Sequence, residues 1–156
     1  MSPPYSSIGP VADFTLSSSQ RSAGDDDFVN MLATVTCRGF SGRTAFTIAR
    51  RDVDRFLADA ANLSTKTSDS AQLLGGWDDA EERLCLRITR AGLSGQFTAR
   101  VRIATTGPRE DQWNRVETEF VCASAALATF LSELTGLAAQ EGTANASLAG
   151  DAEAIA

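Results

Sequence analysis

The sequence predicts an α+β domain, with an antiparallel sheet of about five to six strands and two amphipathic helices packed on one face. Three observations lead to this fold class. Several short segments alternate apolar and polar residues at every second position, as half-buried strands do. Two segments repeat apolar residues at helical spacing. Runs of strands are interrupted by these two helices, an order that favours an α+β domain with an antiparallel sheet.

The first half of the domain is predicted to hold strands followed by a helix. Residues 13–16 alternate as a short strand. Residues 28–38 place five apolar side chains on one strand face: Val29, Met31, Ala33, Val35 and Cys37. The turn Gly39-Phe40-Ser41-Gly42 leads into a return strand over 43–49, which completes a hairpin. Residues 51–63 change to helical period and begin with acidic residues, which the helix dipole favours at that end.

The second half is predicted to hold three more strands and a second helix. Residues 71–76 form a short apolar piece that ends in two glycines. Strands follow over 83–88, 96–103 and 113–122, and a hairpin loop over 91–95 joins the first two. Ser124 is a suitable N-cap for a helix that ends at Gly136.

Both chain ends lack apolar periodicity. Residues 1–12 are rich in proline and serine and predict a flexible N-terminal arm. Residues 139–156 are rich in alanine, glycine and serine and predict a disordered tail. The single α+β domain is therefore expected over 13–138.

Composition narrows the classes of function. The chain of 156 residues contains no histidine, which excludes Ser-His-Asp and Cys-His catalysis. Its three cysteines lie far apart and predict buried apolar roles rather than disulfides or a zinc site. No glycine motif supports a nucleotide, so no cofactor is expected. No residues have the spacing of metal ligands, so no metal is expected either. The formal net charge of −6 disfavours nucleic acid as a partner. Without a signal segment or a long apolar run, the expected location is the cytoplasm and not a membrane.

Two groups of residues are candidates for binding a protein. The first is a ladder of charges on the outward face of the strands over 96–103 and 113–122: Arg100, Arg102, Glu117 and Glu119. Such ladders are common on solvated sheets, and a mixed-charge face also suits protein docking. The second is the acidic turn formed by Trp77, Asp78, Asp79, Glu81 and Glu82. Its spacing does not match a calcium loop, whereas tryptophan beside acids is suited to an interface.

The order of several segments resembles the DUF6228-type and WapI-type bacterial immunity families over residues 38–134. The segments that carry this resemblance are Gly39-Phe40-Ser41-Gly42, Asp54-Arg55-Phe56-Leu57, Leu74-Gly75-Gly76-Trp77, Leu84-Cys85-Leu86, Gly95 to Val101, Trp113 and Leu127 to Leu134. Immunity proteins bind and neutralise partner toxins. The resemblance therefore implies a protein-binding role, and it brings no catalytic residue with it.

The leading expectation is a cytoplasmic, non-enzymatic binding domain, an immunity-type inhibitor that neutralises a toxin by occlusion. An acidic sheet surface on this chain would suit a basic toxin domain. The first alternative is a structural or regulatory module that acts through homo-oligomerisation, as a host or phage adaptor. The second is a carboxylate- or metal-dependent enzyme that uses the acidic turn at 78–82.

Overall fold

The computed structural model describes residues 11–18, 28–65, 69–76, 82–91, 95–106, 113–139 and 145–151. In chain order the elements are β1 (Val11–Ser18), β2 (Phe28–Cys37), β3 (Phe40–Ala49), α1 (Arg50–Ser64), β4 (Ser70–Gly76), β5 (Glu82–Ala91), β6 (Gln96–Thr106), β7 (Trp113–Ala123), α2 (Ser124–Ala139) and β8 (Asn145–Asp151).

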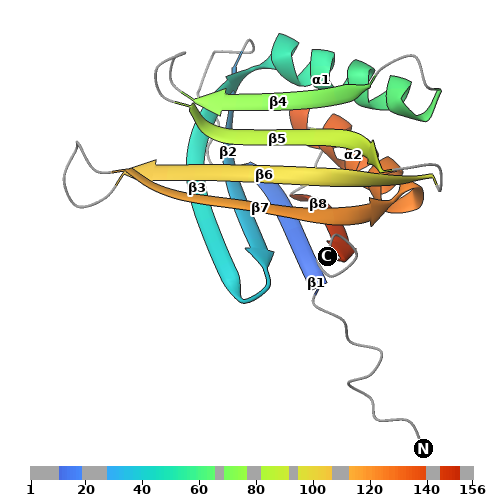
Figure 1. Cartoon of the computed structure of the whole chain (residues 1–156). Coiled ribbons are helices and arrows are strands. Elements are labelled where there is room, and N and C mark those ends of the chain that lie inside the picture. Colours follow the sequence, from blue (N-terminus) through green and yellow to red (C-terminus); the bar gives the residue numbers. More distant parts are fainter. Residues whose placement is uncertain are drawn as a thin grey trace, which may run out of the picture.

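The strands form one open antiparallel sheet in the order β3-β2-β1-β8-β7-β6-β5-β4, with two helices packed against it (Figure 1). The α+β class is confirmed. The sheet has eight strands rather than five to six, because the short piece ending in Gly75-Gly76 and the C-terminal segment both pair as strands.

The β2–β3 hairpin turns on two residues. Arg38 and Gly39 have φ values of 53° and 81°. Two positive φ values define the turn whose twist matches the flanking strands. The return strand therefore begins at Phe40, before the predicted residue 43, and Gly42 lies within it. All five apolar residues predicted for one face of β2 are buried.

The sheet curls so that β3 crosses the inner face of the layer formed by β4–β7. Figure 1 shows β4–β7 running across the view and β1–β3 running steeply behind them. A Cβ added at Gly42 of β3 would lie 3.3 Å from Cβ of Val116 on β7. Further along β3, Phe46 packs on Gly75 of β4 so closely that a Cβ added at Gly75 would overlap the ring of Phe46. The inner faces of the two layers form one core.

Both helices pack against the inner face of the sheet. α1 begins at Arg50 and buries four apolar side chains at helical spacing: Val53, Phe56, Ala60 and Leu63. In α2, the ring of Phe130 meets the ring of Phe14 edge-on at 6.1 Å between centroids. α2 continues past Gly136, where an end was predicted, because Leu137 and Ala138 are buried in the core. The guanidinium of Arg50 donates a hydrogen bond to the carbonyl oxygen of Ala138, which joins the two helices.

The predictions for both chain ends need correction. Residues 145–151, assigned to a disordered tail, form β8 and pair with β1 along its length. Ala146 and Leu148 are fully buried, so apolar burial offsets the low strand propensity of this segment. Val11 and Ala12, assigned to the flexible arm, belong to β1, and Ala12 is fully buried. Residues 1–10, 140–144 and 152–156 lie outside the described residues.

Neither helix in the described part of the chain has the length and apolar character that crossing a bilayer demands.

Candidate functional site

The predicted charge ladder lies on the outer face of β6 and β7. In the register of these strands, Arg100 is opposite Glu119 and Arg102 is opposite Glu117. Nη2 of Arg100 lies 3.4 Å from Oε1 of Glu119, and Nε of Arg100 lies 3.8 Å from Oε1 of Glu117. The side chains of Arg100 and Glu117 are exposed and that of Glu119 is partly exposed, and ion pairs at the surface contribute about 0.2–1 kcal/mol each. The ladder therefore adds little to the stability of the fold.

The acidic turn cannot be placed relative to this ladder. Trp77, Asp78, Asp79 and Glu81 lie outside the described residues. Glu82 opens β5, and only its backbone is described. Among the described side chains, no three Cys, Asp or Glu are grouped as metal ligands would be.

The outer face of β5 extends the ladder with arginines that were not predicted to belong to it. Arg87 is opposite Arg100, and Cys85 is opposite Arg102. The alternation of β5 already indicated that Arg87 points away from the core. The position of Arg87 beside Arg100 depends on the register of the β5–β6 pair, which could not be predicted from the sequence of the loop between these strands.

Arg87 faces a second cation, Arg100, across the β5–β6 pair. Its side chain is exposed, and no carboxylate among the described residues lies within ion-pair distance of it. The neighbouring Arg100 is already engaged by both glutamates of β7. Like charges directly opposite one another destabilise a sheet, by up to about 1 kcal/mol. This cost has no structural compensation within the described part of the fold.

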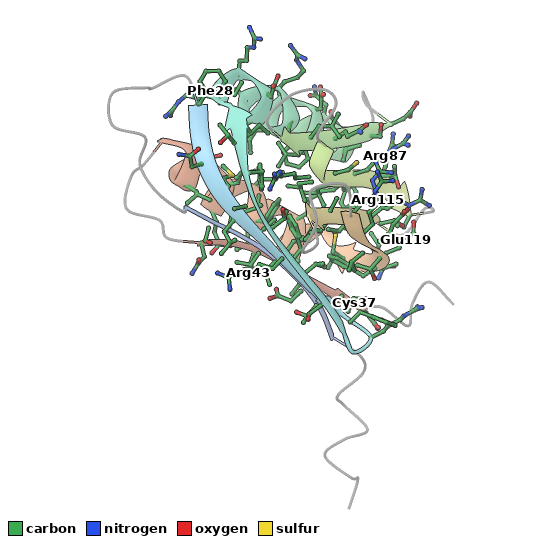
Figure 2. The ribbon with its side chains drawn as sticks, turned by 90° about the vertical axis from the view of Figure 1, so that its left-hand side faces the viewer. Phe28, Cys37, Arg43, Arg87, Arg115 and Glu119 are labelled. Atoms are coloured by element: carbon green, nitrogen blue, oxygen red, sulfur yellow. The ribbon has the colours of Figure 1, made fainter. Side chains whose placement is uncertain are left out.

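We call this surface the arginine face. It consists of Gln72 and Leu74 from β4, Arg83, Cys85 and Arg87 from β5, Arg100 and Arg102 from β6, and Arg115, Glu117 and Glu119 from β7. Figure 2 shows Arg87, Arg115 and Glu119 directed away from the core on the same side of the molecule.

The arginine face is positively charged, although the whole chain is acidic. Its described side chains comprise five arginines and two glutamates. The described side chains of this face therefore do not form the acidic sheet surface that was expected. The described side chains of the whole chain include eleven arginines and nine carboxylates, so the acidic surplus falls in the segments outside them. Net charge follows from composition alone and does not report where charges lie.

The β4 side of the arginine face carries an apolar spot. Leu74 is 49% exposed and lies opposite Cys85. Nε2 of Gln72 donates to Sγ of Cys85 at 3.5 Å, which positions both side chains beside Leu74. A large exposed leucine next to arginines has the composition of an interface centre, where an apolar contact is surrounded by charged groups.

Comparison of the chain with protein-family models, with curated proteins and with solved structures finds no match. The resemblance to immunity families stays a prediction.

Proposed function

We propose that this chain is a protein-binding domain whose arginine face covers an acidic surface of a partner protein. The observation that carries this proposal is the cross-strand pair of Arg87 and Arg100, in which Arg87 has no carboxylate partner among the described residues.

A carboxylate from a partner would relieve this like-charge pair. Guanidinium groups bind carboxylates in a planar, bidentate geometry, which gives direction as well as charge attraction. Arg87 and Arg100 lie on adjacent strands whose axes are separated by about 4.7–4.9 Å. One acidic side chain placed between them would contact both guanidinium groups and remove the repulsion.

Leu74 would supply the apolar contact of such an interface. Its half-exposed side chain lies on the same face as Gln72 and Arg87, which are opposite one another in the β4–β5 register. The Leu74–Cys85 pair is the next pair on that face. Charges at the edge of an interface set specificity and association rate, whereas a desolvated apolar anchor slows dissociation. The arginine face combines both kinds of group.

A protein partner fits this face better than a nucleic acid. Single strands are bound on sheets by stacking bases on aromatic rings, and no described side chain of the arginine face is aromatic. Glu117 and Glu119 would also repel phosphate groups.

An inhibitor of the immunity type is the form of this function that we favour, because it needs only tight occlusion of a partner. The toxin would then present an acidic surface to the arginine face, rather than the basic surface first expected. A gene for a secreted toxin directly upstream would support this role.

The proposal is tested by affinity capture from the native cell with wild-type chain and matched charge-reversal variants. Arg87→Glu removes the key cation, whereas Arg55→Glu reverses an exposed arginine on α1 that lacks an ion-pair partner among the described residues. A partner is expected to bind the Arg55→Glu variant normally, and the Arg87→Glu and Leu74→Ala variants at least about tenfold more weakly. Its binding should also weaken as salt rises.

A charge swap completes the test. Replacing the partner carboxylate that contacts Arg87 by lysine should restore binding to the Arg87→Glu variant. If every captured protein binds the Arg87→Glu and Arg55→Glu variants equally well, the arginine face is not the docking surface and the proposal fails.

A further inference from the structure

The two edges of the sheet differ in how they are protected against pairing with another chain. β4 is seven residues long, its register with β5 shifts between Gly75 and Gly76, and α1 runs beside it (Figure 1). Short length, irregularity and a covering helix are the usual protections of an edge strand. β3 has ten residues in unbroken register with β2, without proline or bulge. No described strand pairs with its other edge.

The hairpin turn determines which backbone groups of β3 are free. Cys37 and Phe40 flank the two-residue turn, so they form a hydrogen-bonded pair, and hydrogen-bonded pairs recur at every second residue along the hairpin. The N–H and C=O groups of the even-numbered residues 40–48 therefore point towards β2. Those of the odd-numbered residues point away from it: Ser41, Arg43, Ala45, Thr47 and Ala49.

The side chains of these five residues leave the edge accessible. Four of them are Ser, Ala or Thr, and Arg43 carries the only charge. Ser41, Arg43 and Ala45 are exposed. An edge with small side chains and one charge lacks the steric and electrostatic barriers that exclude an incoming strand.

We infer that β3 pairs antiparallel with β3 of a second copy of this chain, about a twofold axis at Ala45. Outward groups can bond only to outward groups, so an odd-numbered residue must face an odd-numbered residue. A twofold axis at Ala45 places Arg43 opposite Thr47 and Ser41 opposite Ala49 of the other copy. This arrangement pairs Arg43, Ala45 and Thr47 of each strand in full and brings Ser41 opposite Ala49, the residue that caps α1.

Registers centred on Arg43 or on Thr47 are weaker. An axis at Arg43 would set two arginines directly opposite one another, which destabilises a sheet. An axis at Thr47 would leave Ser41 and Arg43 of each strand unpaired. In a closed twofold contact the β3 edge of each copy pairs with that of the other. No β3 edge is left open, so the assembly ends at two chains.

This interface is separate from the arginine face. In Figure 2, Arg43 lies on the opposite side of the view from Arg87, Arg115 and Glu119. Self-association through β3 can therefore fail or succeed independently of partner binding by the arginine face.

Sedimentation velocity of the full chain over a concentration series is the first test. The wild type is expected to shift from 16.5 kDa towards twice that mass as concentration rises. Ala45→Pro removes an outward N–H group that β2 does not use, and edge strands tolerate proline at such positions. This variant is expected to stay folded by circular dichroism and to remain a monomer.

A second variant keeps the test decisive if Ala45→Pro misfolds. Ala45→Lys places two like charges opposite one another on the axis and is expected to weaken the dimer several-fold. Thr36→Lys adds the same charge to an exposed position of β2, which is an interior strand, and should leave the dimer unchanged. A wild type that is monomeric up to about 1 mM overturns the inference.

Hydrogen exchange then identifies the strand involved. In the dimer, the amide protons of Arg43, Ala45 and Thr47 should become protected as concentration rises. The amides of Thr44 and Phe46 already face β2 and should not change. A dimer that persists in Ala45→Pro, or that lacks this alternating protection, uses another surface and refutes the proposed pairing.

Discussion

The crossing of β3 over β4 makes a sharp prediction, because it depends on a glycine at one contact. Gly75 is buried beneath the ring of Phe46, and an added Cβ would overlap that ring. Phe46 is itself only 3% exposed, so the ring has little space into which it can move. Gly75→Ala is therefore expected to destabilise the fold by about 1–3 kcal/mol, the usual cost of overpacking a core.

Removing the ring should remove this cost. Phe46→Ala alone is expected to lower the free energy of unfolding by about 3–5 kcal/mol, because it leaves a cavity. In that background, Gly75→Ala should cost nothing or restore some stability, since the new methyl group fills part of the cavity. The coupling between the two sites is then about 1–3 kcal/mol.

Urea denaturation followed by circular dichroism measures all four members of this cycle. Gly42→Ala is the control, because it adds the same methyl group to β3 at a contact of 3.3 Å with Val116, where a small adjustment suffices. Its effect should be smaller than that of Gly75→Ala. If the Gly75 and Phe46 substitutions prove additive, the two strands do not cross at this contact and the curled sheet described above is wrong.

Three further predictions concern α2, β7 and β8. Oε1 of Glu133 accepts a hydrogen bond from the backbone N–H of Ser147 at 3.2 Å, so Glu133→Ala should destabilise the fold by about 1–3 kcal/mol in urea denaturation, and Glu133→Gln, which retains an acceptor, should destabilise it less. Burial raises the pKa of the Cys122 thiol from 9.0 to about 11, so the stability linked to this thiol is present below pH 9 and falls between pH 9 and 11. Denaturation across this range should show a loss that Cys122→Ala removes; an equal loss in the variant would contradict the assignment. A chain ending at residue 151 should fold, whereas one ending at 144 should aggregate or unfold on gel filtration, because removing β8 exposes Phe14 and Leu16 of β1.

Much of the charge ladder could be predicted from the sequence, but the position of Arg87 beside Arg100 could not. Alternation along β6 and β7 was sufficient to place Arg100 and Glu119 on one outer face. The positive charge of the described side chains on that face was not predicted. It depends on β5 lying next to β6 in the register that sets Arg87 opposite Arg100. Charges on two strands add only when those strands are neighbours, and adjacency is a property of the fold.

The sequence by itself determined the α+β class, the inward faces of β2 and the position of α1, because strand alternation and helical spacing arise from local backbone geometry. Tertiary structure alone decided that residues 145–151 form a strand and that β3 crosses β4. The first depends on pairing with β1, which lies at the other end of the chain. The second depends on one glycine that admits a phenylalanine ring. Both are contacts between residues distant in sequence, and local periodicity carries no information about such contacts.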